Sequence, residues 1–461
     1  MDISKVQGKY MMQCWSDQAS YSPIAVEKTE GCYIHTKDGR KIFDLRSAHE
    51  CVNLGFNHPK VQQAIIEQLN KVVYVTDDFA TEPTALLAQK LASITPGSAN
   101  KKVWFGQSGA SSVEAAIKAA RMYKYNQLME GGTNQYAANR QYPYPYKIVS
   151  RYRSWHGATM GALSASGDPR KWFNEPLTVP GFIQAPDAYP FRSPFGEDPD
   201  GLKAAEYMRY MIEMEGGSAF VAAVLVEPVV GSNGVIPAPK AYMKRLREIC
   251  DEFDLLLIVD ETMTGMGRTG KLLAIEHYDV EPDIIIMGKA LGVYCPISAT
   301  IFSEKVAASF DENIFGHGQS YSGHALGAAA ALASLEVIEQ ENLLEHTIEM
   351  GAYLESELLE LQEKHASVGE VRGVGLMWTM ELVKNQQTKE SFRNISEKYT
   401  ETPVKQMARF LLDEKDIYVP GDKFGLWIFP PLIVTKEEID MLISAFDEAL
   451  EITDLAMKNT I

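Results

Sequence analysis

Two charged side chains stand at the ends of apolar runs in the middle of the chain. Asp260 ends the run 255–259, and Lys289 follows the run 284–287 after a single glycine. Runs of four or five consecutive aliphatic residues predict strands that are buried on both faces of a parallel sheet. Because open α/β sheets bind ligands at the carboxyl ends of their strands, we expect Asp260 and Lys289 at one ligand-binding edge.

An acid and an amine at one sheet edge suit a cofactor with an electrophilic carbon and a basic ring nitrogen. Pyridoxal phosphate is such a cofactor, because a lysine forms a Schiff base with it and an acid partners its pyridinium nitrogen. A third apolar run, 222–226, ends at Glu227 and would bring another acid to a strand's carboxyl end. Our working hypothesis is a pyridoxal-phosphate enzyme with Lys289 and Asp260 as its catalytic residues.

A turn of small residues, 106–112, joins a short predicted strand at 103–105 to a predicted helix from residue 113. A strand, a Gly/Ser turn and a helix N-terminus can bind an anion through backbone N–H groups and hydroxyls. The same residues would also serve as a capped helix start without a ligand, and the turn alone favours neither. Similarly, Trp155 after the strand-like run 147–150 could lie on a cofactor ring, although a Trp–His pair packs more often within a core.

Strands and helices alternate through the middle of the chain, which predicts an α/β protein with a mainly parallel sheet and helices on both faces. The two ends of the chain show a different pattern. An Asp38-Gly39 turn predicts a hairpin near the N-terminus, whereas we expect a strand over 371–381 and helices over 340–365, 402–413 and 436–451. This C-terminal part is typical of an α+β unit.

The composition is that of a soluble globular protein, with 46% hydrophobic and 23% charged residues. The net charge of −17 disfavours nucleic acid and anionic membranes as partners. Five scattered cysteines without metal-ligand spacing predict free thiols, a reducing compartment and no metal site. We find neither a signal peptide nor a membrane span, so we expect a cytoplasmic protein.

Five ordered motifs then resemble one family, the class III (ω-amino acid) pyridoxal-phosphate-dependent aminotransferases. They are Asp260-Glu-x-x-Thr-Gly-x-Gly-Arg-x-Gly270, Lys289, the Ser108-Gly109 turn, Trp155-His-Gly, and His317-Gly-x-Ser-Tyr-Ser-Gly-His324. The resemblance extends from about residue 15 to residue 450. It implies fold type I, with a large domain at 60–325 and a smaller α+β domain from both termini, 1–59 and 326–461.

The resemblance also implies roles for individual residues. Lys289 would form the Schiff base, and Asp260 would partner the pyridine nitrogen. The other implied cofactor-binding residues are Ser108, Gly109 and Ala110 at the phosphate, Trp155 on the ring, His156 beside it, Glu227 near the substrate, and Thr262 where the family usually has valine. Ser320 would reach the phosphate from a neighbouring subunit, which implies a homodimer with a shared active site.

The resemblance implies an amine and a keto acid as substrates, and departures from the family pattern indicate which amines are disfavoured. Family members that act on 4-aminobutyrate or ornithine have arginine where this chain has Ala158, and arginine again where it has Trp427. Indole cannot replace a bidentate guanidinium, which disfavours 4-aminobutyrate, ornithine and acetylornithine. The remaining cations near the motifs are Arg151, Arg153, Arg192 and Lys423.

The overall pattern is similar to taurine aminotransferases. We therefore expect an ω-amine donor such as taurine, with 2-oxoglutarate or pyruvate as acceptor, and β-alanine, a diamine or another amine as alternative donors. Trp15, Arg153 and Trp427 are the residues expected near the substrate, although Trp15 could equally be a packing residue.

A non-catalytic scaffold of the same fold is disfavoured because Asp260 and Lys289 are both present, and two other rival hypotheses remain. Residues 265–270 fit the GxGxxG fingerprint of dinucleotide-binding oxidoreductases, but the segment before Pro282 is too short for a crossover helix. The other rival keeps pyridoxal phosphate and changes the reaction to decarboxylation, a mutase reaction or racemisation, which fold alone does not exclude.

Overall fold

The structure is a computed structural model that describes residues 1–130, 144–175, 177–393, 401–420 and 424–458. Its centre is a seven-stranded sheet in which only one strand runs antiparallel to its neighbours, so the predicted mainly parallel sheet is confirmed. In spatial order the strands are β4 (Lys102–Gly106), the antiparallel β12 (Ser298–Phe302), β11 (Ile284–Met287), β10 (Leu256–Asp260), β7 (Val221–Val226), β5 (Lys147–Arg151) and β6 (Phe182–Ala185).

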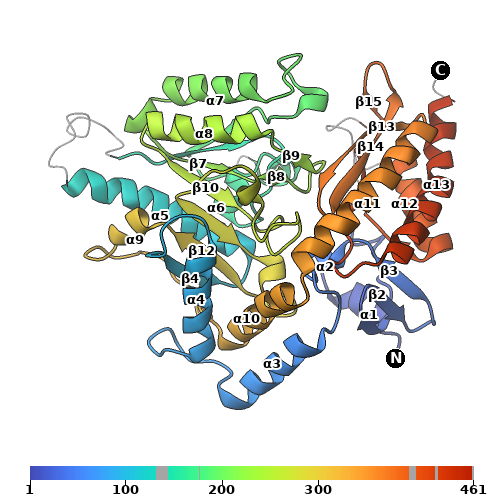
Figure 1. The fold of residues 1–461 in the computed structure, drawn as a ribbon, viewed down its shortest axis with the longest axis horizontal. Coiled ribbons are helices and arrows are strands. Elements are labelled where there is room, and N and C mark those ends of the chain that lie inside the picture. Colours follow the sequence, from blue (N-terminus) through green and yellow to red (C-terminus); the bar gives the residue numbers. More distant parts are fainter. Residues whose placement is uncertain (131–143, 176, 394–400, 421–423, 459–461) are drawn as a thin grey trace.

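The central strands are buried throughout because helices cover both faces of the sheet (Figure 1). Alternate residues of β10 pack into two different cores, Leu257 and Val259 on one face and Leu256 and Ile258 on the other. The first face is covered by α3 (Pro59–Lys71), α4 (Glu82–Ile94), α7 (Leu202–Met214), α8 (Lys240–Glu252) and α10 (Ala325–Gln340). The second face is covered by α5 (Gly109–Glu130), α6 (Met160–Ala165) and α9 (Glu304–Ala308).

A smaller α+β unit lies beside the large sheet and has its own core (Figure 1). It contains the strands β13 (Val368–Val374), β14 (Met377–Asn385), β15 (Glu390–Ser391) and β17 (Gly425–Ile428), and the helices α11 (Leu343–Lys364), α12 (Pro403–Lys415) and α13 (Lys436–Lys458). A second sheet joins the two ends of the chain, because β16 (Ile417–Tyr418) pairs with β3 (Lys41–Asp44). The small unit is therefore built from both termini, while the predicted boundaries at residues 59 and 325 stay predictions.

The N-terminal part supplies the rest of that second sheet. The predicted hairpin at Asp38-Gly39 is confirmed, because β2 (Tyr33–Thr36) pairs antiparallel with β3. The remaining elements are α1 (Ile3–Tyr10), β1 (Val26–Glu30), the short α2 (Ser47–Glu50), and the paired β8 (Val229–Val230) and β9 (Ile236–Pro237). Among the described residues, no helix combines the length and apolar character needed to cross a membrane.

The prediction of one strand over 371–381 is wrong. The chain instead forms an antiparallel hairpin of β13 and β14 that turns at Gly375, whose φ is +60°. A Cβ atom there would lie 2.6 Å from the backbone carbon of Thr269, so only glycine fits this left-handed turn. The alternating pattern continued across the turn and concealed it.

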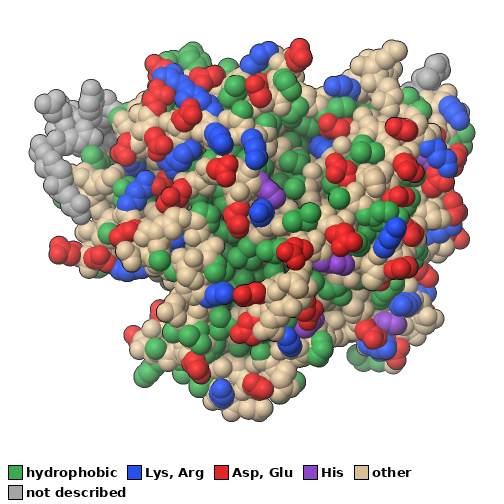
Figure 2. Space-filling model, viewed as in Figure 1, with side chains coloured by type: hydrophobic (Ala, Val, Ile, Leu, Met, Phe, Trp, Pro, Cys, Tyr) green, Lys and Arg blue, Asp and Glu red, His purple; other side chains and the backbone are tan. Residues whose placement is uncertain are grey.

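Acidic and basic side chains are interspersed over the face of the molecule shown in Figure 2.

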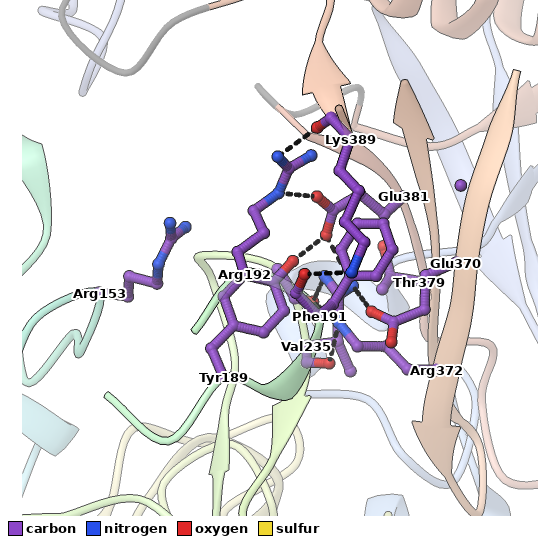
Figure 3. A network of polar contacts seen from close by, with 12 residues as sticks. Arg153, Tyr189, Phe191, Arg192, Val235, Glu370, Arg372, Thr379, Glu381 and Lys389 are labelled. Carbon is purple, nitrogen blue, oxygen red and sulfur yellow. Dashed lines mark hydrogen bonds and ion pairs between the residues drawn. The ribbon is translucent and has the colours of Figure 1, made fainter. Parts of the chain in front are cut away.

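The two cores meet along the seam between the large sheet and the small unit. A buried cluster around Glu381 of β14 lies at this seam. Glu381 accepts hydrogen bonds from Tyr189 and Arg192 of the large unit and pairs with Arg372 of β13 (Figure 3). Arg372 in turn donates to the carbonyls of Gly234 and Val235, so this cluster holds the two units together.

Candidate active site

A cavity of about 140 Å³ lies at the carboxyl ends of β7, β10 and β11. It brings together most of the residues that the sequence motifs had indicated. The residues that line it are Gly109, Ala110, Trp155, His156, Gly157, Glu227, Val229, Ser232, Asp260, Thr262, Met263 and Lys289.

Asp260 is held in place at the end of β10 by two hydrogen bonds. Its Oδ2 accepts from His156 Nδ1 at 2.8 Å, and its Oδ1 accepts from the backbone N–H of Thr262 at 3.0 Å. Because an ionised carboxylate can only accept a hydrogen bond, we assign the proton of this bond to Nδ1 of His156. His156 is itself fixed by a bond from its backbone N–H to Ser166 Oγ. The buried carboxylate of Asp260 is thus kept in one orientation.

Lys289 follows β11 in the left-handed region, with φ of +46°. Its Nζ donates to Glu50 Oε2 at 2.8 Å, and Glu50 Oε1 lies 3.3 Å from Arg46 Nε. Burial raises the pKa of Glu50, but the positive charges of Lys289 and Arg46 outweigh it and the pKa lies below its ordinary value. Glu50 was not predicted, because it lies in a short polar segment far from every motif.

The start of α5 forms another wall of the cavity. Gly109 allows the side chain of Thr262 to pack closely against the start of α5, because a Cβ atom at position 109 would lie 2.6 Å from Thr262 Cγ2. A Cβ atom on Gly157 would lie 2.5 Å from that of Ala110. Thr262 Oγ1 is buried and meets no hydrogen-bond partner among the described residues. The first N–H groups of a 22-residue helix and a hydroxyl therefore border a space that can receive an anion.

Ser108 lies on the outer side of the same turn, where it lines an adjoining hollow of about 510 Å³. The other residues of this hollow include Lys118, Thr159 and the loop 316–319. Ser320 lines neither this hollow nor the cavity at Lys289; its backbone carbonyl accepts a hydrogen bond from Tyr74. Within one chain, then, the structure does not bring Ser320 to the cavity.

Trp155 borders the cavity and takes part in a stack of side chains. The guanidinium of Arg170 lies over its ring, with Cζ 3.5 Å from the ring centroid, and Trp15 meets Trp155 edge-on with centroids 5.6 Å apart. Arg170 is held by two hydrogen bonds to the carboxylate of Asp168 and one to Ser232 Oγ. Arg170 was not predicted, because it lies in the short 3₁₀ helix Pro169–Asn174, where nothing in the sequence indicates its proximity to Trp155.

Glu227 lies at the end of β7 and is fixed from two sides. Its Oε1 accepts from the backbone N–H of Trp155 at 3.1 Å, and Arg151 donates to its backbone carbonyl. Burial raises the pKa of Glu227, although the charges of His156 and Arg151 oppose this effect.

The other cations considered as substrate ligands have different surroundings. Arg151 is buried against Glu227, and Arg192 pairs with Glu381 (Figure 3). Arg153 stands to one side of that cluster, where its Nε lies 3.1 Å from Asp187. Lys423 falls outside the described residues.

Trp427 does not line the cavity. Its ring lies 5.4 Å from the guanidinium carbon of Arg46, the residue that pairs with Glu50. Trp427 is thus connected to Lys289 through Arg46 and Glu50.

The dinucleotide hypothesis is wrong. Residues 265–270 form turns after β10, and no helix follows them before the short 3₁₀ turn Ala274–His277. A dinucleotide site needs a helix N-terminus directly after its glycines to receive the pyrophosphate.

The side chains of the cavity fit pyridoxal phosphate. Lys289 offers an amine for the aldehyde, Asp260 a fixed carboxylate for the ring nitrogen, and α5 with Thr262 an anion site for the phosphate. Fold and cavity together define a pyridoxal-phosphate-dependent enzyme of fold type I. The sequence model of the family Aminotransferase class-III matches residues 15–450, and the chain belongs to this family. The protein is accordingly a pyridoxal-phosphate-dependent aminotransferase.

Three relatives of known sequence or structure carry the names of aminotransferases. The chain is 33% identical over 457 residues to the taurine–pyruvate aminotransferase of Bilophila wadsworthia, covering 97% of this chain and 96% of the relative. It is 35% identical over 427 residues to the acetylornithine aminotransferase of Methanocaldococcus jannaschii, covering 92% and 93%. The structure of taurine:2-oxoglutarate aminotransferase from Bifidobacterium kashiwanohense, in complex with PLP and glutamate, matches with a TM-score of 0.90 at 31% identity, covering 99% and 98%. These three relatives are all named as aminotransferases, but the amino donors in their names differ.

Proposed function

We propose that the protein transfers an amino group from an ω-amine that carries an anionic group, taurine in the first instance, to 2-oxoglutarate or pyruvate. The position of the Arg170 side chain is the observation that carries this proposal. Its guanidinium contacts Trp155 and Ser232, which both line the cavity, whereas positions 158 and 427 hold alanine and tryptophan. The similarity to two taurine aminotransferases supports the same donor.

The roles of the residues follow from their geometry. When bound, pyridoxal phosphate supplies an electrophilic carbon and an electron-withdrawing ring. We propose that Asp260 holds a proton at the ring nitrogen and that the N-terminus of α5 binds the phosphate. Lys289 would hold the cofactor through its ε-amine, and the same ε-amine would serve as the base that takes the proton from the substrate carbon.

The substrate side of the cavity would be shaped by aromatic and cationic groups. Trp155 borders the cavity, Trp15 lies edge-on against Trp155, and Arg170 over the Trp155 ring would supply the positive charge that an acidic substrate needs. Arg153, which pairs with Asp187, would add to that charge. The guanidinium of Arg170 already donates two hydrogen bonds to Asp168. An incoming sulfonate or carboxylate would accept a further, charge-assisted hydrogen bond from the same guanidinium.

A panel of donors tests this proposal. We expect taurine to be turned over with a kcat/KM at least about 10-fold above those of β-alanine, 1,4-diaminobutane and N-acetylornithine, with pyruvate and 2-oxoglutarate compared as acceptors. Replacing Arg170 with glutamine should raise the KM for taurine by about 10- to 100-fold, because a charge-assisted hydrogen bond contributes about 1.5–3 kcal/mol. Sulfoacetaldehyde and the new amino acid are measured by mass spectrometry.

Arg409→Gln on α12, an exposed position, is the matched control and should leave every KM unchanged. A preference for 1,4-diaminobutane would refute taurine and favour a second candidate, a diamine transaminase. The buried carboxylate of Glu50 beside Lys289 is the observation that favours it, because a second ammonium group could pair there. Loss of substrate chirality without any need for a keto acid would instead indicate a racemase.

We further propose that the working form is a homodimer. Ser320 lies away from the cavity of its own chain, and the hollow at Ser108 is open beside the loop 316–319. A second copy could place its own loop there, next to the N-terminus of α5. Sedimentation velocity at micromolar concentration should give the mass of two chains, and a monomer with full activity would contradict this proposal.

A further inference from the structure

Glu50 reaches Lys289 through an unusual stretch of backbone. Ser47, Ala48, His49 and Glu50 all adopt left-handed conformations, with φ between +46° and +61°, and none of them is glycine. Each such residue costs about 1–2 kcal/mol relative to a right-handed conformation. Consecutive strained residues persist only where the surrounding structure determines them, and they concentrate at functional sites.

Hydrogen bonds to side chains hold this turn. Asp44 accepts from the backbone N–H groups of Arg46 and Ala48, the second at 2.7 Å. The hydroxyl of Ser47 donates to the carbonyl of Phe429 at 2.5 Å, which ties the turn to the small unit. The result is that the carboxylate of Glu50, only 2% exposed, points into the interior at Lys289.

The groups around Glu50 favour its ionised form. Lys289 and Arg46 each contact one of its two oxygens, and the buried guanidinium of Arg268 adds positive charge nearby. His49 also lies close, but burial and the charge of Arg46 lower its pKa, which favours its neutral form. Lys289 is in the left-handed region as well, so two strained segments 239 residues apart in the sequence meet at one hydrogen bond.

We propose that Glu50 is a positioning residue for Lys289, aiming its ε-amine and stabilising the ammonium that forms when Lys289 takes a proton from the substrate. This proposal rests on the function proposed above for Lys289. In that step a C–H bond of the substrate would break and an N–H bond would form at Nζ, the electron pair left on carbon would be taken up by the electron-withdrawing ring of the bound cofactor, and Glu50 would stay ionised throughout. A fixed carboxylate placed where positive charge develops lowers the energy of that step without reorganising.

The test combines three variants with a measurement that needs no turnover. In the full-length protein freed of cofactor, Lys289 is methylated with formaldehyde and cyanoborohydride at pH 7, and its modification rate is followed by peptide mass spectrometry. Only the neutral amine reacts, so Glu50→Gln should accelerate methylation of Lys289 by about 10-fold or more. Glu50→Asp keeps the charge and should restore part of the protection. Glu27→Gln, on the exposed strand β1, should match the native protein.

Steady-state kinetics of the loaded enzyme supply the second readout. Glu50→Gln should lower kcat by about 10- to 100-fold with KM changed less than about 3-fold, and the isotope effect of a donor deuterated next to its nitrogen should rise. Unchanged methylation together with unchanged kcat would overturn the proposal. So would an equal fall in kcat for Glu50→Asp and Glu50→Gln without any change in methylation, because that pattern indicates a packing defect. If the native enzyme transferred no amino group at all, the proposed function would fail, while the methylation rates would still decide whether Glu50 holds Lys289.

Discussion

A Lys289→Ala variant should lose amino transfer almost completely, with kcat falling by at least about 10⁴-fold. Alanine removes both the covalent attachment at rest and the base that moves the substrate proton, and a positioned base alone contributes about 10²- to 10⁴-fold. The measurement is steady-state formation of the new amino acid from the acceptor. A second readout is borohydride reduction, which should add the mass of the cofactor to the peptide with Lys289 in the native enzyme and to no peptide in the variant.

Lys364→Ala provides the control, because this lysine is exposed on α11 and lies in the small unit. It should retain native rates and native labelling. Cofactor fixed to a different lysine, or full activity of Lys289→Ala, would show that the assignment of the attachment point is wrong.

An Asp260→Asn variant should lower kcat by about 10³-fold while leaving the fold intact. Asparagine has the shape of aspartate and can still accept from the N–H of Thr262, but it carries no charge to hold a proton at the cofactor's ring nitrogen. Removing one fixed electrostatic contact of this kind typically costs about 10²- to 10³-fold in kcat. Kinetics report the loss, and the visible absorption spectrum of the bound cofactor should shift because the ring nitrogen loses its charged partner.

Asp279→Asn is the matched control, since Asp279 is exposed on the loop that precedes β11. It should leave both the rate and the spectrum unchanged. If Asp260→Asn kept the native spectrum and rate, the ring nitrogen would have to face another group, and the orientation of the cofactor proposed here would be wrong.

Much of the large unit could be predicted from the sequence. Strands buried on both faces must be apolar along their whole length, so the runs 222–226, 255–259 and 284–287 indicated β7, β10 and β11 directly. Charged residues at the ends of such runs can only emerge at the sheet edge. That constraint alone is enough to predict that Asp260, Glu227 and Lys289 lie close together, and all three line the cavity.

The differences between prediction and structure have two physical causes. The sequence pattern predicts one strand in place of the hairpin at Gly375, because strand alternation continues across this tight turn. Arg170 and Glu50 lie in segments without apolar periodicity, so no pattern indicates what they approach. Their positions depend on long-range hydrogen bonds, from Arg170 to Ser232 and from Lys289 to Glu50.

By itself, then, the sequence determined the α/β class, the sheet edge with Asp260 and Lys289, and the family, because these follow from local patterns and short motifs. Only the tertiary structure decided which acid meets Lys289 and which cation lies against Trp155. Lys289 and Glu50 are 239 residues apart in the sequence, and Arg170 reaches Trp155 and Ser232 through tertiary contacts, so packing rather than local preference sets both contacts.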